Sequence, residues 1–467
     1  MKKIAFIFLI VLVSCSKKDI IEPEVPKITT SVSSNYDNFQ GYKVSPDAKQ
    51  LGINYWKNLP VMADLFVGAY QKGVKPLTGP YGNGKYEYSS TTFALSLGDF
   101  NNDGWIDIFN GGGACGGKGA NLSFLIWNPS NKTFEEKNLI NDGTNFIGGP
   151  ARAISLYLNS DDFVDIVIIG HADECGHGPN EKCRIILSDG KGKYTISELD
   201  LEPQYLFDAF NYCGGDVGDL NGDNLPDLIV AANSHTYIFW GMPGYPYFSR
   251  QNFAHFSSDL ANFPSNNSFG ESVPSGAGLV FRAWAANLND DNKNDLLLGT
   301  AETPNSPNKF LLNLGNGRFN QSALVNLPIT GITNQERIDY IVDDLNQDGL
   351  KDLIALDCIT ENSQQRWDIL VYIRQQNGTF LLDKNWIQYT LNVNSRPNSK
   401  WSLIYTDFDL DGKKDIGYID SGVMPSRDPN NDLIKKSVFI RSGNKFIEKD
   451  FYELDPYAKA VKENFFK

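Results

Sequence analysis

Oxygen-bearing side chains recur at regular spacing in the nine-residue segment 344–352. Its expected ligands stand at positions 1, 3, 5 and 9, and position 7 can add its backbone carbonyl: Asp344, Asn346, Asp348, Asp352 and Leu350. Hard oxygen donors of this number and flexibility suit Ca²⁺ better than Mg²⁺, which requires a tight octahedron and keeps its waters. A helix–loop–helix calcium site would have Glu at position 12, where this chain has Ala355 inside an apolar run. We therefore predict a calcium loop that leads into a buried strand.

The same pattern recurs along the chain. Copies begin at residues 99, 157, 219, 287, 344 and 407, so successive copies lie 57 to 68 residues apart. The expected ligands of the other complete copies are Asp99, Asn101, Asp103, Trp105 and Asp107 in 99–107; Asp219, Asn221, Asp223, Leu225 and Asp227 in 219–227; Asn287, Asn289, Asp291, Lys293 and Asp295 in 287–295; and Asp407, Asp409, Asp411, Lys413 and Asp415 in 407–415. A period of this size indicates a repeat architecture.

The complete copies differ in charge. Segment 407–415 carries the most carboxylates and should bind calcium most tightly, whereas 287–295 begins with two Asn ligands and should bind it most weakly. Calcium could act as a Lewis acid in catalysis. A catalytic ion has no need to be repeated five times, however, so we expect calcium to neutralise carboxylates and to fix hairpins.

Segment 157–165 is a degenerate copy, because Tyr157 stands where the first ligand should be, ahead of Asn159, Asp161 and Asp165. In all six copies, position 6 is a residue type that tolerates a positive φ, and we expect a tight turn there. These residues are Gly104, Asp162, Asn224, Asn292, Gly349 and Gly412.

Short apolar runs rich in branched residues flank the loops, which indicates strands rather than helices. Runs lead in at 94–97, 153–156, 282–285, 340–342 and 403–405, and lead out at 166–169, 228–230, 296–298 and 353–356. A second hairpin, with a turn followed by an aromatic residue, is predicted at 131–134, 190–194, 315–319, 376–380 and 443–446. Four-stranded units repeated radially make a β-propeller, so the predicted fold class is all-β. A β-solenoid has shorter coils, and a string of sandwich domains needs longer repeats.

The repeated loops resemble the FG-GAP or VCBS repeat, the calcium-binding blade of integrin α-subunit propellers and of many bacterial surface proteins. The resemblance covers about residues 90–452. It implies a propeller of seven four-stranded blades, with calcium held in loops between the first and second strands. Because only six loops are visible, residues 36–90 would supply a blade without a loop, and six blades remain the alternative. Residues 243–278 interrupt the period and are predicted to be an insertion between repeats three and four.

The N-terminus has the features of a processing signal rather than of a folded element. Lys2 and Lys3 precede an apolar run that is too short to span a bilayer comfortably. Residues 12–15 look like a bacterial lipobox, which implies a signal segment 1–15 and acylation of Cys15, with the lipid as the only membrane anchor. Residues 16–19 resemble the charged signal that sends Bacteroidota lipoproteins to the cell surface. Residues 16–35 are predicted to form a flexible tether, and 36–467 a single propeller domain.

The chain is acidic, with a formal net charge of −14, and many of its carboxylates lie in the repeated loops. This balance argues against a nucleic-acid partner. We expect a monomer in the oxidising or non-reducing setting of the cell envelope, where some cysteines can pair. The candidate disulfide pairs are Cys175 with Cys183 and Cys115 with Cys213.

Strand alternation places the connections after the second strands, and the starts of the first strands, on the face opposite the calcium loops. The candidate ligand-binding residues on that face are His171, Asp173, Glu174, His177, Asp208, Tyr212, Arg282 and Trp401. A zinc site among the His and Cys residues matches no standard spacing. Aromatic, acidic and Arg side chains suit glycan or peptide binding, so the predicted function is recognition of a glycan or of an envelope or surface protein. The alternatives are a polysaccharide lyase or glycosidase and a scaffold for envelope assembly.

Overall fold

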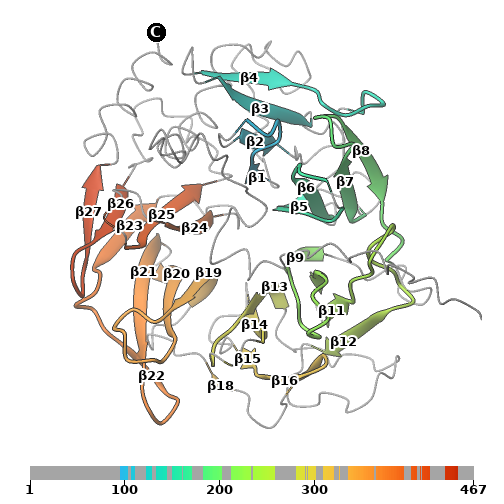
Figure 1. The fold of residues 1–467 in the computed structure, drawn as a ribbon. Helices are drawn as coiled ribbons and strands as arrows, with labels where there is room; N and C mark the ends of the chain where they lie inside the picture. The colour runs from blue at the N-terminus through green and yellow to red at the C-terminus, as the bar shows by residue number, and fades with distance from the viewer. Residues whose placement is uncertain are drawn as a thin grey trace, which may run out of the picture.

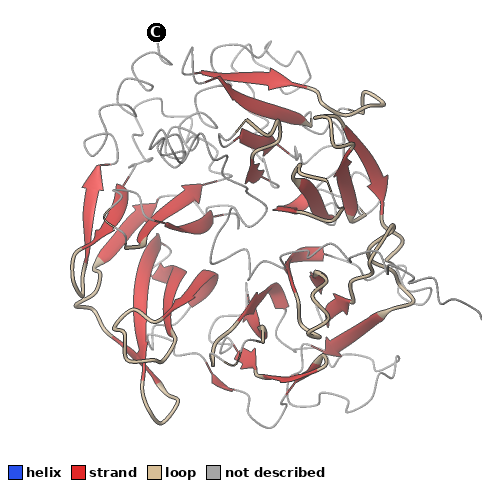
Figure 2. Ribbon diagram, in the orientation of Figure 1, coloured by secondary structure: helices blue, strands red, loops and turns tan. Residues whose placement is uncertain are grey.

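The computed structural model describes residues 95–103, 107–110, 122–128, 133–144, 150–159, 161–170, 182–201, 212–232, 235–257, 280–289, 291, 293–300, 309–319, 325–326, 335–361, 364–393, 401–406, 411, 413–420 and 437–450. Every element in these ranges is a β-strand, and Figure 2 shows only strands and loops there. The predicted all-β class is therefore confirmed. No helix in the described residues is long and apolar enough to cross a membrane.

Six antiparallel sheets, which we number in chain order, contain nearly all of the described strands. Sheet one is β1 (Leu95–Gly98), β2 (Asp107–Asn110), β3 (Ser123–Asn128) and β4 (Thr133–Lys137). Sheet two is β5 (Pro150–Leu156), β6 (Asp165–Gly170), β7 (Arg184–Ser188) and β8 (Tyr194–Glu198). Sheet three is β9 (Tyr212–Gly218), β10 (Asp227–Ala232), β11 (His235–Phe239) and β12 (Phe253–Ser257).

The remaining sheets contain two variations on the four-stranded plan. Sheet four is β13 (Val280–Ala286), β14 (Asp295–Thr300), β15 (Lys309–Leu311) and β18 (Val325–Asn326), with the separate hairpin β16 (Asn313–Gly315) and β17 (Arg318–Phe319). Sheet five is β19 (Gln335–Asp343), β20 (Asp352–Glu361), β21 (Gln364–Arg374) and β22 (Phe380–Leu382), and β23 (Tyr389–Val393) also pairs with β21. Sheet six is β24 (Trp401–Thr406), β25 (Asp415–Asp420), β26 (Ser437–Arg441) and β27 (Phe446–Asp450).

The sheets follow one another in chain order around a common centre, with their first strands innermost (Figure 1). Each sheet from one to five contacts the next through an innermost strand, as in the contacts of β1 with β5, β5 with β9 and β19 with β24. Strand order within each sheet runs outward from the first strand to the fourth. The loop between the first two strands therefore always lies near the inner part of a sheet.

The apolar cores lie between successive sheets. Successive side chains of a strand point to opposite faces. Strand β6 accordingly sends Ile166 and Ile168 into the core shared with sheet one, and Val167 and Ile169 into the core shared with sheet three. All four side chains are fully buried. Burial on both faces explains why this strand is an unbroken apolar run.

The predicted insertion at 243–278 was wrong in part. Residues 253–257 form β12, which pairs with β11 as the fourth strand of sheet three. The turn before β12 has no Asn-Gly or Gly-Asn step, and its chain reversal includes a cis bond between Tyr245 and Pro246. The predicted turn at 315–319 does exist, but it belongs to the hairpin β16–β17 rather than to the main sheet.

Candidate metal centre

Each candidate loop joins the first strand of a sheet to the second, as predicted. Position 1 directly follows the first strand, and position 9 is the first residue of the second strand in all six copies. The two strands pair up to this boundary, for example Asp343 with Asp352 and Gly218 with Asp227. The antiparallel hairpin therefore brings both ends of the loop together and closes it.

The carboxylate at position 9 is fully buried in every copy, at 0% exposure. In sheet five, Leu345 N donates to Asp352 Oδ2 over 2.9 Å and Arg374 N donates to Asp352 Oδ1 over 2.8 Å. The first donor belongs to position 2 of the same loop, and the second lies at the end of the third strand. Equivalent pairs of backbone donors hold Asp165, Asp227 and Asp295. Position 9 thus ties its loop to the rest of its sheet.

Burial also changes the acidity of these carboxyls. Desolvation raises the pKa of Asp165 and of Asp227 to about 7, and the pKa of Asp295 and of Asp352 to about 6. The backbone N–H bonds act in the opposite direction, because they favour the charged form. A cation bound in the loop would favour the charged form as well.

The side-chain oxygens at positions 1, 3 and 5, which are the expected metal ligands, converge in loop 344–352. The N–H of Asp348 lies 3.0 Å from Asp344 Oδ1 and 3.1 Å from Asn346 Oδ1, so oxygens from positions 1 and 3 approach one point. Asn346 Nδ2 lies 2.9 Å from Asp348 Oδ2. The atoms of these three side chains that can bind a metal are all oxygens, and the amide nitrogen of Asn346 is their one other polar atom. The donor set therefore fits a hard cation such as Ca²⁺.

Two further loops share this arrangement. In loop 99–107, Asp103 N donates to Asp99 Oδ1 and to Asn101 Oδ1 over 2.9 and 3.2 Å. In loop 219–227, position 1 accepts N–H groups from positions 4 and 6, and position 3 accepts one from position 5. Trp105 and the segment 407–410, which includes two expected ligands of the sixth loop, Asp407 and Asp409, lie outside the described residues.

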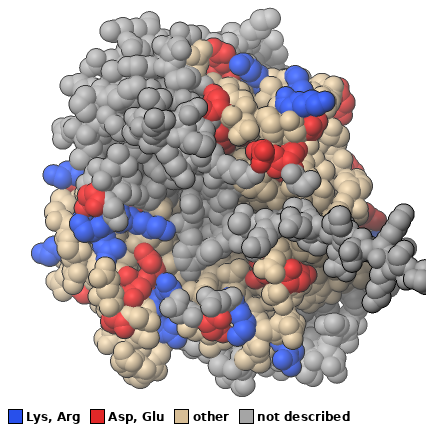
Figure 3. Space-filling model, in the orientation of Figure 1, with Lys and Arg blue, Asp and Glu red and all other residues tan. Residues whose placement is uncertain are grey.

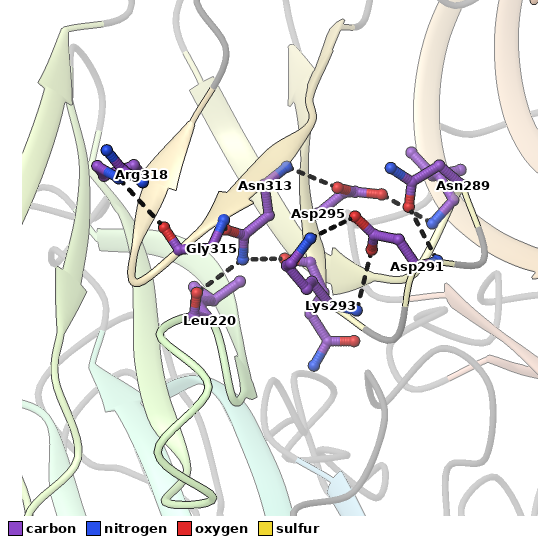
Figure 4. A network of polar contacts seen from close by, with 10 residues as sticks. Leu220, Asn289, Asp291, Lys293, Asp295, Asn313, Gly315 and Arg318 are labelled. Carbon is purple, nitrogen blue, oxygen red and sulfur yellow. Dashed lines mark hydrogen bonds and ion pairs between the residues drawn. The ribbon is translucent and has the colours of Figure 1, made fainter.

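A Lys at position 7 distinguishes loops 287–295 and 407–415. Lys293 Nζ lies 2.8 Å from Asp291 Oδ2, and Lys413 Nζ lies 2.7 Å from Asp411 Oδ2. Although burial opposes it, hydrogen bonding to Lys293 lowers the pKa of Asp291, and hydrogen bonding to Lys413 lowers that of Asp411. Figure 4 shows Lys293 and Asp291 beside Asp295 and Asn313. A cation entering either loop would therefore compete with an ammonium group for a carboxylate oxygen.

The degenerate loop 157–165 is organised differently. Asn159 Nδ2 donates to Ser188 O over 3.1 Å and lies 3.4 Å from Asp165 Oδ1. In the other described loops that have Asn at position 3 and leucine or tryptophan at position 7, the amide instead approaches the carboxylate at position 5. Asn159 thus takes part in the hydrogen bonding around position 9 instead of approaching position 5.

The backbone confirms part of the turn prediction. Asn224 and Gly349 at position 6 have φ values of 65° and 83°. Position 4 is also left-handed, at Asn102, Gly222 and Gln347, which the sequence pattern did not indicate. Asp162 has no positive φ, and Gly104, Asn292 and Gly412 lie outside the described residues.

The opposite face is described only in part. Tyr212, Arg282 and Trp401 lie at or near the starts of β9, β13 and β24, at the strand ends away from the loops, as predicted. His171, Asp173, Glu174, His177 and Asp208 lie outside the described residues, as do Cys15, Cys115 and Cys175. Cys183 is 2% exposed and precedes β7, and Cys213 lies in β9. The predicted disulfides therefore stay predictions.

Figure 3 shows acidic side chains in several separate groups, with basic side chains among them, on the described part of one face. Among the described residues, no three or more His, Cys, Asp and Glu side chains are arranged to hold a metal ion. In loop 344–352, for example, the converging side chains are two carboxylates and one Asn, and Asn is not one of these four residue types.

No family model matches the chain, and no curated protein is significantly similar to it.

Proposed function

We propose that this chain is a calcium-stabilised β-propeller of the FG-GAP or VCBS type. The radial order of the sheets and the repeated loop between their first two strands support this proposal. Residues 36–90 would add a seventh blade to the six described sheets. Calcium in the loops would neutralise carboxylates that each loop holds close together, so its role is structural.

The propeller would be exported, anchored in the outer membrane through an acylated Cys15 and displayed at the cell surface. The lipobox-like residues 12–15 and the polar segment that follows them support this location. In that setting we propose that the protein recognises a glycan or another envelope protein. The connections between second and third strands on the face opposite the loops differ in length and composition in the sequence, and loops of this kind often carry function.

The extension of sheet five is the observation that carries the recognition proposal. Strand β20 has ten residues, whereas β6, β10, β14 and β25 have six each, and all five begin at position 9 of a loop. At about 3.3 Å per residue, the four extra residues extend the second strand by about 13 Å away from the calcium loops. Strand β23 pairs with this part of β21 and adds a further strand to it.

Polar groups lie on this extension and directly beside it. Arg366 Nε is 3.1 Å from Asp368 Oδ2, and the two side chains are 26% and 9% exposed. Asp357 is the direct cross-strand neighbour of Asp368 and is fully buried. A partly exposed guanidinium held by a carboxylate is suited to hydrogen bonding with sugar hydroxyls or with an acidic peptide.

Binding by variants of the extension tests the recognition proposal. We expect Arg366→Ala to weaken binding to a glycan-array hit, or to a captured envelope protein, by about tenfold or more. Arg184→Ala is the matched control, because Arg184 forms a similar pair with Glu198 on β7 and β8 of sheet two. Equal affinity of Arg366→Ala and the unmodified chain for the bound ligand would place recognition elsewhere.

A further inference from the structure

The second residue of each described metal loop is held from two sides. Its N–H donates to the carboxylate at position 9 of the same loop, as for Leu220, Leu288 and Leu345. Its carbonyl accepts a side-chain donor from the following sheet. This residue stands between ligand positions 1 and 3, so whatever fixes it also restricts both ligands.

The side chains that bind these carbonyls occupy one structural position. Asn313 Nδ2 donates to Leu220 O over 2.7 Å, Arg374 Nη1 donates to Leu288 O over 2.6 Å, and Arg441 Nη2 donates to Leu345 O. The backbone N–H of each of these three residues donates to position 9 of its own sheet. We call Asn313, Arg374 and Arg441 the clasp residues, because each one joins two successive loops.

Aromatic rings hold the two Arg clasps in place. The guanidinium carbon of Arg374 lies 5.8 Å from the centre of the Phe380 ring, and that of Arg441 lies 5.7 Å from the centre of the Trp386 ring. The Nε atom of each Arg is buried without a hydrogen-bond partner. Each guanidinium group is therefore positioned by its bond to a loop carbonyl and by one aromatic ring.

The bonds form one continuous path through four loops. It runs from Asp227 through Leu220 to Asn313, on through Asp295 and Leu288 to Arg374, and then through Asp352, Leu345 and Arg441 to Asp415. The path ends at sheet three, because the equivalent residue there is Gly241, whose N–H reaches Asp227 but which has no side chain. Loop 99–107 lies on the other side of this break, where Tyr194 Oη donates to Phe100 O.

We propose that the clasp residues are positioning residues that couple calcium binding among loops 219–227, 287–295, 344–352 and 407–415. An ion that orders one loop fixes its position 9, hence the clasp, and hence the second residue of the preceding loop. The preceding loop then loses less conformational freedom when it binds its own ion, which makes binding cooperative. Loop 99–107 binds independently. This inference rests on the proposed calcium-binding function.

Local hydrogen exchange during a calcium titration of the full chain tests the coupling. Asp344→Asn removes a ligand from loop 344–352 only. We expect it to shift the calcium concentration at which peptide 287–295 is half protected from hydrogen exchange. The expected shift is about fivefold or more, and fivefold is the lower end of usual allosteric couplings. In the background of Arg374→Met, which keeps the backbone N–H and the alkyl chain, the same substitution should no longer shift that concentration. Arg374→Lys, which retains a cationic donor, should restore part of the shift.

Two controls separate the outcomes. The protection of 99–107 should be insensitive to Asp344→Asn, and Arg184→Met should leave the coupling intact. If Arg374→Met does not fold, Arg441→Met tests the next junction in the same way, with peptide 344–352 as the reporter and loop 407–415 carrying the position-1 ligand substitution Asp407→Asn. Calcium binding with an unshifted midpoint for 287–295 in Asp344→Asn would overturn the coupling alone. Failure of the unmodified chain to bind calcium by calorimetry would overturn the proposed calcium function as well.

Discussion

At the residue scale, the conserved geometry of position 9 separates two roles that look alike in the sequence. An Asp that opens a buried strand can be a metal ligand or a hydrogen-bond acceptor for its own loop. In segment 157–165, where Tyr157 replaces the first ligand, Asp165 still accepts N–H groups from Leu158, Asn159 and Ser188. The buried carboxylate therefore organises the loop even where the set of metal ligands is incomplete.

Substitution of Asp165 tests this role. Asp165→Asn keeps the side-chain shape but replaces one acceptor oxygen by a donor, which faces a backbone N–H. We expect the free energy of unfolding to fall by about 1 to 3 kcal/mol, the usual cost of an unsatisfied buried polar group. Urea unfolding should show the same loss with and without calcium.

The matched control is Asp161→Asn in the same loop, because Asp161 is partly exposed and its Oδ1 accepts the N–H of Phe163 over 2.9 Å. It should cost less than Asp165→Asn. A loss for Asp165→Asn that appears only in the presence of calcium would show that Asp165 acts as a ligand instead.

The sequence predicted the ligand positions but could not predict the clasp residues. The residues that donate to position 9 from the end of the third strand, or from just after it, lie 23, 14, 18, 22 and 26 residues after position 9, so they have no fixed spacing. Their types also differ, because a backbone N–H makes the contact with position 9 and every residue except Pro supplies one. Only the paired strands bring them to one place.

At the scale of the element, the strands were predictable because burial on both faces leaves a clear pattern. The runs that leave the loops at 166–169, 228–230 and 296–298 lie within β6, β10 and β14. The fourth strands were harder, because they are outermost and less apolar. Strand β12 was assigned to an insertion for this reason, and β18 has only two residues.

Strand β9 depends on a close approach that only Gly permits. A Cβ atom on Gly215 would lie 1.9 Å from Ile229 O and 2.8 Å from Ile169 Cδ1, which belongs to the neighbouring sheet. We expect Gly215→Ala to lower the free energy of unfolding by about 3 kcal/mol, at the upper end of the usual range for overpacked cores. Thermal unfolding monitored by circular dichroism measures the loss.

Gly244→Ala is the control for this strand, because a Cβ atom there would meet nothing within 4 Å. It should change stability by less than about 0.5 kcal/mol. A Gly215→Ala variant as stable as this control would show that β9 and β10 are farther apart than described.

At the scale of the whole molecule, ions bound to the folded state alone should stabilise it by mass action. Each site contributes about 2.7 kcal/mol when free calcium is 100 times its dissociation constant. Chelation with excess EGTA should therefore lower the melting temperature of the chain markedly, and calcium, unlike magnesium at equal concentration, should restore it. An unchanged melting temperature would contradict the structural role of calcium.

The clasps bear on how an array of this kind can lengthen. Each clasp residue belongs to the sheet that follows the loop it holds, so a sheet inserted after one of these loops must bring its own clasp residue to hold that loop. Tandem duplication of sheet four, five or six would supply such a residue, whereas duplication of sheet three, which has Gly241 at this position, would not. A break at the junction between sheets two and three would remove no clasp. Gly241 occupies the clasp position of sheet three and has no side chain that could reach Leu158 O in sheet two. The boundary between sheets two and three is accordingly held by its shared apolar core and by Arg250, whose N–H donates to Asp200 O, rather than by a clasp.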